Sequence, residues 1–207
     1  IITDGRQKWR QADMPSYWVQ LANYKNAAAT PTESDWASLR AAQNAALALP
    51  HTGQAVIIDV GDANDIHPHD KQTVAHRLAL MALQNDYGQT EVYSDSPQPV
   101  EAHTDAAGNV IVTFDHVARG LKAHNRYGYV NAFAMAGTDG HYQWAQAEVV
   151  GLSQVRLHTP RGMVPAKVRY AWADNPDDAN LYNSAGLPAT PFELKIDRQG
   201  AVPEPRQ

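Results

Sequence analysis

Hydrophobic and polar residues in the first 88 positions follow two different periods. Residues 17–21 are aromatic and β-branched, which predicts a strand, and the apolar run at residues 56–60 predicts a second, buried strand. Apolar residues at helical spacing predict a helix over residues 30–49, ended by Pro50, and another over residues 68–87. This order of strand, helix, strand and helix indicates a βαβ unit with a parallel sheet and a right-handed crossover.

Both predicted helices carry capping signals. Thr30 has the place of an N-cap, Pro31 that of the first helical residue, and Glu33 can close a capping box. Pro68 suits the first turn of the second helix, because the missing N–H leaves no donor unpaired there. We expect Gly88 to end that helix in the left-handed conformation.

Beyond Gly88 the helical period disappears, and short β-branched or aromatic runs alternate with turn signals. Seven such runs predict an antiparallel β-sandwich, at residues 92–93, 110–114, 129–135, 142–145, 148–150, 154–157 and 167–170. Residues 172–192 are rich in Pro, Asn and Asp, and we expect ordered loop there. The expected organisation is an α/β unit at residues 1–88, a sandwich at residues 89–196 and a flexible tail at residues 197–207.

Composition narrows the function classes. The net charge is −5, and Lys and Arg are scattered, so we expect no nucleic-acid partner. No apolar run approaches the roughly 20 residues of a membrane span, so we expect no membrane partner. The chain has no cysteine, which excludes thiol catalysis but does not fix the compartment. Because the chain starts at Ile1 without a Met, we expect a fragment or a mature product, with a periplasmic or secreted location.

The segment between the second strand and the second helix, residues 59–71, carries the densest chemistry. It holds four carboxylates and two histidines, namely Asp59, Asp62, Asp65, Asp70, His67 and His69. In α/β proteins ligands bind where strands end and helices begin, so this loop is the candidate site. His67 can act as a general base, because imidazole exchanges a proton near neutral pH. The alternative is a helix-start residue that only bonds to backbone.

The same loop can be interpreted as a metal site. His67 and His69, with Asp62, Asp65 and Asp70, are residue types that bind zinc. A His-Pro-His sequence entering a helix rarely aims both rings at one point, and a metal site requires converging ligands. We therefore expect neither a metal nor another cofactor.

Several segments resemble the sialate O-acetylesterase family. They are Tyr-Trp-Val-Gln-Leu-Ala-Asn-Tyr at residues 17–24, Trp-Ala-Ser-Leu-Arg at 36–40, Asp-Ile-His-Pro at 65–68, Arg-Leu-Ala-Leu at 77–80, Arg-Tyr-Ala-Trp-Ala-Asp-Asn-Pro at 169–176, Asn-Leu-Tyr-Asn at 180–183 and Gly-Leu-Pro-Ala-Thr-Pro-Phe at 186–192. The resemblance runs from about Thr3 to Phe192. The Asp-Ile-His-Pro segment is short. Together with the segments at residues 169–176 and 180–183, in this order, it is specific for the family.

The resemblance implies an SGNH-type serine hydrolase: a flavodoxin-like α/β/α domain with an associated antiparallel β-sandwich, which hydrolyses O-acetyl esters on sugars. In that family a Gly-Gln-Ser-Asn motif supplies the nucleophile, and a Gln-Gly-Glu-Ser-Asn motif supplies an oxyanion-hole Asn. Neither motif is present in these 207 residues. We therefore expect the C-terminal portion of such an esterase, which contributes His67 and has as its partner an N-terminal segment or chain carrying the serine.

The resemblance also bears on the carboxylate that orients His67. SGNH enzymes often place an Asp three residues before the His, but that position is Asn64 here. Asp65 is the favoured catalytic partner, with Asp62 or a backbone carbonyl as alternatives. The family pattern further suggests Ser34 as an alternative cap for the first helix.

The predicted function is a carbohydrate O-acetylesterase that uses a Ser–His mechanism on an O-acetylated sugar. The alternatives are a non-catalytic carbohydrate-binding sandwich and an inert structural domain. The loop with Asp65 and His67 favours the enzyme, because a binding module would not need it. Trp144 and Trp172 could stack on sugar rings, although packing inside the protein is the preferred interpretation for both.

Overall fold

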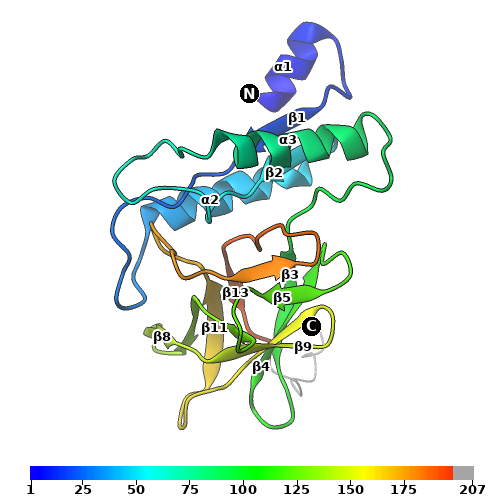
Figure 1. The fold of residues 1–207 in the computed structure, drawn as a ribbon. Helices are drawn as coiled ribbons and strands as arrows, with labels where there is room; N and C mark the ends of the chain where they lie inside the picture. The colour runs from blue at the N-terminus through cyan, green and yellow to red at the C-terminus, as the bar shows by residue number, and fades with distance from the viewer. Residues whose placement is uncertain (198–207) are drawn as a thin grey trace, which may run out of the picture.

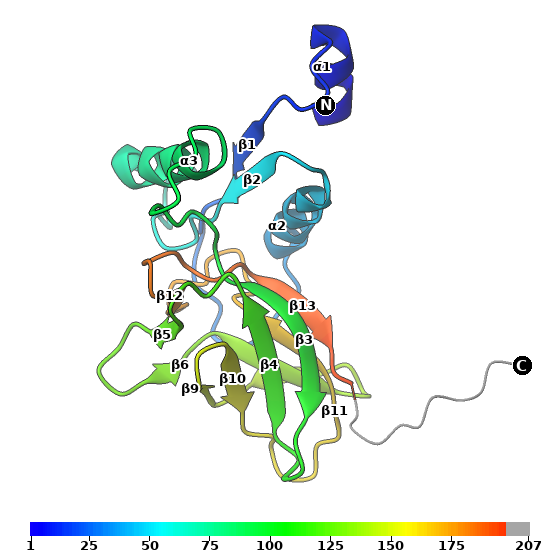
Figure 2. The same cartoon turned by 90° about the vertical axis from the view of Figure 1, so that its right-hand side faces the viewer.

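The computed structural model describes residues 1–197, and its first part is a two-stranded parallel sheet between helices. The elements are α1 (Ile2–Trp9), β1 (Ser16–Val19), α2 (Asp35–Ala45), the short 3₁₀ helix η1 (Ala46–Ala48), β2 (Thr52–Ala55) and α3 (Lys71–Asn85). β1 and β2 pair in parallel, from Ser16 opposite Thr52 to Val19 opposite Ala55. α2 and α3 lie on opposite faces of this sheet (Figure 2). The predicted βαβ unit is therefore confirmed.

The second strand lies earlier in the chain than predicted. Residues 56–58 are buried but belong to no strand, and β2 ends at Ala55. Val56 and Ile58 belong to the large core of the β-rich part, whereas Ile57 packs with Met81 against α3. The apolar run thus joins two cores, and this double burial, not strand pairing, explains its composition.

The helix starts also differ from the predictions. The hydroxyl of Ser34 accepts a hydrogen bond from the Ala37 N–H at 2.9 Å, so Ser34 is the cap of α2 and the Thr30–Pro31 start is wrong. Asp70 caps α3 by accepting from the Thr73 N–H at 2.9 Å, which places Pro68 outside the helix. Gly88 follows α3 with φ of 65°, the left-handed conformation expected.

The rest of the described chain forms two larger antiparallel sheets and a two-stranded ribbon (Figure 1). Its strands are β3 (Gln98–Thr104), β4 (Val110–Asp115), β5 (Leu121–Ala123), β6 (Tyr129–Val130), β7 (Phe133–Gly137), β8 (Tyr142–Trp144), β9 (Ala147–Val150), β10 (Gln154–Leu157), β11 (Pro165–Tyr170), β12 (Leu181–Asn183) and β13 (Phe192–Lys195). One sheet has the order β3-β4-β10-β9-β6, the other β13-β11-β7-β8, and the ribbon pairs β12 with β5. Side chains from both larger sheets share one core.

Six of the seven predicted strands are present, and residues 92–93 are not a strand. Four strands were missed, namely β3, β5, β12 and β13, and β12 lies inside the segment predicted as loop. Of the predicted tail, Asp197 donates its N–H to the Ala102 carbonyl at 2.8 Å, and residues 198–207 lie outside the described part. No helix within residues 1–197 is long and apolar enough to span a bilayer.

Arg40 joins the helical part to the β-rich part. Its side chain is fully buried in α2 and donates to the backbone oxygens of Leu21, Ala22, Ala173 and Asp174 over 2.6–2.9 Å. Burial lowers the pKa of Arg40 to about 10, so the guanidinium stays charged at neutral pH. Because a buried charge requires partners on every side, this residue fixes the two parts relative to each other.

Candidate functional site

The candidate loop, residues 59–71, lies between the end of β2 and the start of α3 (Figure 1). Because α3 starts only at Lys71, His67 lies in a turn before the helix and not in its first turn. The imidazole is 80% exposed. The helix start predicted at Pro68 is therefore wrong, and the orientation of the ring depends on contacts within the loop.

Asp65 lies against the His67 ring. Oδ1 of Asp65 is 3.3 Å from Nδ1 of His67 and also accepts a hydrogen bond from the His67 backbone N–H at 2.8 Å. Oδ2 of the same carboxylate is 3.3 Å from Nε2 of His69. A carboxylate at Nδ1 leaves Nε2 of His67 directed elsewhere, which is the arrangement in which an imidazole exchanges protons at Nε2.

The Asp65 carboxyl is held in its charged form. Its pKa lies below the ordinary value, chiefly because the His67 N–H donates to it and further because the His69 ring does. A carboxylate that stays ionised can stabilise a neighbouring imidazolium. Among the ion pairs of residues 1–197, Asp65 is the carboxylate that lies beside the His67 ring.

Asp62 serves its own turn: its carboxylate accepts from the Asn64 N–H at 2.7 Å. Asp70 is engaged by the backbone and hydroxyl of Thr73. Within residues 1–197 no three His, Asp or Glu side chains are grouped as a metal ion would require.

Three serines of the chain, Ser34, Ser94 and Ser184, have structural roles or lie buried. Among the described residues, none of them forms a hydrogen bond with His67. Ser34 caps α2 and donates to Asp174. The Ser94 hydroxyl is buried without a partner, and that of Ser184 accepts from the Arg119 N–H. A nucleophile for His67 is not supplied by these residues.

Sequence reasoning missed the residues that anchor the loop. Arg77 of α3 forms a two-point contact with Asp59, with N–O distances of 2.6 and 2.7 Å, and also donates to the Val56 carbonyl. The hydroxyl of Tyr182 donates to Asp59 at 3.1 Å. Arg77, Tyr182, Asn23 and Asn175 all lie in segments that carry the family resemblance. The sequence therefore marked these segments, but it did not show that their side chains contact the loop.

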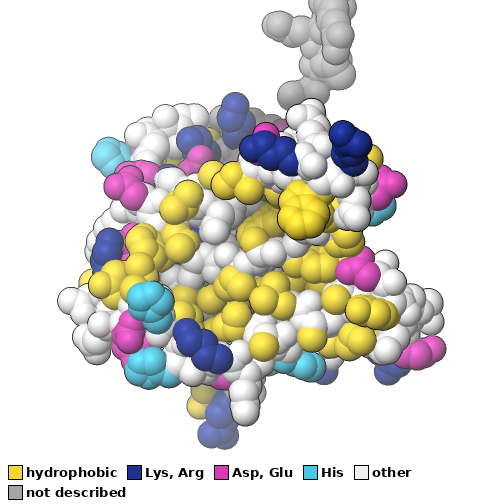
Figure 3. All heavy atoms as spheres, turned by 90° about the horizontal axis from the view of Figure 1, so that it is seen from above, with side chains coloured by type: hydrophobic (Ala, Val, Ile, Leu, Met, Phe, Trp, Pro, Cys, Tyr) yellow, Lys and Arg dark blue, Asp and Glu magenta, His cyan; other side chains and the backbone are white. Residues whose placement is uncertain are grey.

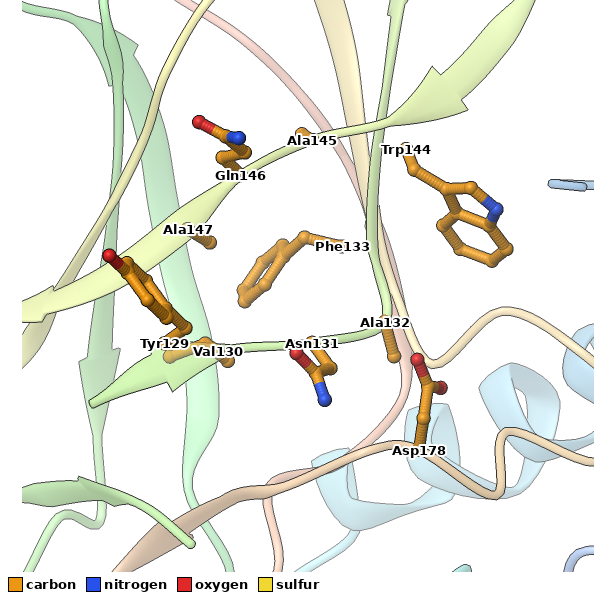
Figure 4. Close-up of a pocket in the computed structure, with 10 residues that line it drawn as sticks. All are labelled: Tyr129, Val130, Asn131, Ala132, Phe133, Trp144, Ala145, Gln146, Ala147 and Asp178. Carbon is orange, nitrogen blue, oxygen red and sulfur yellow. The ribbon is translucent and has the colours of Figure 1, made fainter. Parts of the chain in front are cut away.

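A cavity of about 450 Å³ opens between β6, β7, β8 and the loop with Asp178. Figure 4 shows the Phe133 ring in the middle of the lining residues, with Tyr129 and Trp144 on its two sides. Trp144 is 46% exposed and donates its indole N–H to the Ala29 carbonyl at 3.0 Å. Trp172 packs under the Arg169 guanidinium, 4.9 Å from the ring centroid. Both Trp residues therefore make contacts inside the protein.

The fold has a counterpart among known structures. A crystal structure of a carbohydrate acetylesterase from Xanthomonas citri matches with a TM-score of 0.85 and 40% sequence identity, over 93% of this chain and 44% of that chain. Residues 1–197 thus have the fold of part of a carbohydrate acetylesterase. No protein-family model matches the chain.

Sequence relatives identify the family more narrowly. The sialate O-acetylesterase of Mus musculus is 32% identical over 165 residues, which is 73% of this chain and 30% of the mouse protein. The Homo sapiens sialate O-acetylesterase is 31% identical over 165 residues, with 73% and 31% coverage. The chain is a homologue of the sialate O-acetylesterases, as its sequence motifs predicted. It spans about 30% of the length of these relatives.

Proposed function

We propose that the complete protein is a carbohydrate O-acetylesterase, in which this chain supplies the base His67 and the orienting carboxylate Asp65. The observation that carries the proposal is the contact of Asp65 with Nδ1 of His67, on a loop of a chain homologous to acetylesterases. An O-acetylated sugar is the proposed substrate.

The proposed reaction is acyl transfer in two steps. Nε2 of His67 accepts the proton of a serine hydroxyl as its oxygen bonds to the acetyl carbonyl carbon. When the tetrahedral intermediate collapses, the bond to the sugar oxygen breaks and that oxygen takes the proton from His67. A water molecule then attacks the acetyl-enzyme by the same route and releases acetate.

We further propose that residues 1–88 complete an SGNH-type sheet together with an N-terminal segment, while residues 89–196 form the sandwich. Two parallel strands are marginal alone, because parallel sheets are normally covered and flanked. Ser16 and Gln20 donate their N–H groups toward β2 and the residue before it. The backbone N–H and C=O groups of the alternate residues Tyr17 and Val19 therefore point to the open edge of β1. Within the described residues no strand pairs with that edge.

A side chain covers the end of this edge: the amide of Gln43 accepts from the Leu21 N–H at 3.0 Å and donates to the Val19 carbonyl at 3.4 Å. A separate observation supports a neighbour for this part of the chain. Figure 3 shows hydrophobic side chains gathered over the face that carries the sheet and its helices. The exposed large apolar residues in this part of the chain include Trp9, Leu39, Leu49, Ile66 and Tyr87. Such a face is typical of an interaction surface.

The test is the variant His67→Ala in the complete protein, measured on an acetylated sugar. We expect turnover to fall by roughly three orders of magnitude or more, because members of a triad act as a unit. His69→Ala is the matched control, since His69 lies on the same loop and touches the same carboxylate at the same distance of 3.3 Å.

We expect His69→Ala to keep turnover within about threefold of wild type, because its ring is not required for proton transfer. Near wild-type rates in His67→Ala, or an equal loss in both variants, would overturn the assignment of His67.

A further inference from the structure

The segments at residues 169–176 and 180–183 carry much of the sequence resemblance, but no part of the proposed reaction uses them. The side chains of Asn175 and Tyr182, one from each segment, reach toward the loop that carries His67. Residues 169–183 therefore contact both the start of this loop, at Asp59, and the segment with Asn23 and Lys25 that packs beneath it.

Asn175 makes the first contact. Its side-chain oxygen accepts from the Asn23 amide at 2.9 Å, and its amide donates to the Lys25 carbonyl at 2.7 Å. Asn175 is 5% exposed and Asn23 is 9% exposed, so neither amide can exchange these partners for water freely. Buried amides with paired groups define a unique geometry.

Asn23 carries the contact into the candidate loop. Its side-chain oxygen accepts from the Gly61 N–H at 2.7 Å. A Cβ at Gly61 would overlap the backbone oxygen of Asn23, so only glycine permits this close approach. The chain Asn175–Asn23–Gly61 thus links the β-rich part to a residue six positions before His67.

Lys25 adds a parallel contact. It has φ of 70°, which is uncommon for a residue with a side chain. In this conformation its N–H donates to the Ala63 carbonyl at 3.0 Å, while its own carbonyl accepts from Asn175. Its ammonium pairs with Asp174 at 2.7 Å. The strained backbone persists because these contacts determine it from several sides.

A second anchor holds the start of the loop. Tyr182 donates to Asp59, which also binds Arg77, and its ring stacks on His124 at a centroid distance of 3.8 Å. Burial, and then the Asp59 carboxylate, raise the pKa of Tyr182, so its hydroxyl stays a donor.

We propose that Asn175 is a positioning residue, which acts through Asn23 to hold the loop that carries Asp65 and His67. The inference rests on the proposed function, since it assigns the role of residues 169–183 in the same reaction. Misplacement of a catalytic group by about 1 Å can cost roughly a hundredfold in rate. The exposed His67 ring depends on this support, because Asp65, its ion-pair partner among residues 1–197, lies in the same loop.

The experiment compares Asn175→Ala and Asn23→Ala with Asn180→Ala in the complete protein. Asn180 is the matched control: it is 8% exposed, accepts from the Asn131 N–H at 2.8 Å and donates to the Tyr129 carbonyl at 3.0 Å, all within the β-rich part. The measurements are kcat and KM on an acetylated sugar and hydrogen–deuterium exchange of the peptide at residues 59–67, at a temperature where each variant is folded by circular dichroism.

We expect Asn175→Ala and Asn23→Ala to lower kcat by roughly tenfold to a hundredfold with KM within about threefold, and to speed exchange of residues 59–67 at least tenfold. The double variant should lose no more than the larger single loss, because both residues act through one contact. Asn180→Ala should leave kcat and exchange of this peptide unchanged.

Wild-type exchange in Asn175→Ala, or an equal loss of kcat in Asn180→Ala, would overturn the positioning role. The exchange measurement needs no esterase activity. If the wild-type protein does not hydrolyse acetyl esters, the proposed function fails, whereas the effect of Asn175 on the loop is still decided by exchange.

Discussion

Asp65 and His67 show how much a single loop specifies about its own electrostatics. The carboxylate accepts from the His67 backbone and approaches two imidazole rings, all within five residues of sequence. These contacts are local, so they require no distant part of the chain to form. The position of the whole loop is a separate matter, because it depends on Asn23 and Gly61.

The lowered pKa of Asp65 gives a pH prediction at the scale of the residue. A carboxyl with a folded pKa below its ordinary value of 3.8 keeps its stabilising contacts above that value and loses them as the pH falls through the folded pKa. The His67 backbone N–H reports on this contact. We expect its NMR chemical shift to titrate with a midpoint below 3.8.

The variant Asp65→Asn should abolish that titration, since an amide does not ionise in this range. A midpoint at or above 3.8 in the wild-type protein would contradict the hydrogen-bonded, charged state of Asp65.

At the scale of elements, β11 is joined to the segment before α2 by Arg169. The guanidinium is 7% exposed and contacts Glu193 at 2.7 Å and Glu33 at 3.0 Å. It also lies 3.9 Å from the centroid of the Tyr142 ring and stacks near Trp172. Glu33 therefore serves a contact between elements, in place of the capping box that its position in the sequence predicted.

Arg169→Ala should destabilise the protein by roughly 3 kcal/mol, because it leaves a partly buried Glu193 without its main cationic partner. Glu33 is 81% exposed and returns to water at little cost, which places the effect at the lower end for such removals. Urea denaturation followed by Trp fluorescence measures the free energy of unfolding.

Arg156→Ala is the control for this prediction, since Arg156 pairs with Glu148 at 3.4 Å and both side chains are more than one-third exposed. We expect a change within about 1 kcal/mol. Equal effects of the two substitutions would show that burial of Arg169 contributes nothing beyond a surface ion pair.

At the scale of the whole molecule, the sheet of the α/β part has only two strands among the described residues, while the β-rich part surrounds a large core that Val56 and Ile58 also join. β1 and β2 form a parallel pair, and among the described residues no third strand pairs with them. The β-rich part shares one core between its two larger sheets. The two parts are held together by Arg40, Asn175 and Arg169.

The 207-residue chain by itself should have no esterase activity, because a base without a nucleophile and oxyanion donors lacks the main contributions to acyl transfer. We expect it to bind a separately expressed N-terminal segment, which covers the β1 edge and restores hydrolysis. An acetyl-ester assay and light scattering, with and without that segment, measure both outcomes. A stable, monomeric and active 207-residue chain would contradict this prediction.

The sequence alone determined those features that depend on local spacing. The βαβ order follows from hydrophobic periodicity, and six predicted strands follow from β-branched runs between turn signals. The loop with Asp65 and His67 was located because polar residues cluster between a buried run and a helical run. The homology to acetylesterases could be recognised from the sequence because the family motifs occur in a fixed order.

Tertiary structure decided what depends on distant partners. Residues 56–58 are apolar because they serve two cores, so the pattern of a strand appears where none is paired. Ser34 caps α2, while the carboxylate of Glu33 is drawn to Arg169 across 136 positions of sequence. Asn175 contacts Asn23 across 152 positions. Such contacts form only when folding brings the segments together, because hydrogen bonds and ion pairs act over a few ångströms whatever the separation along the chain.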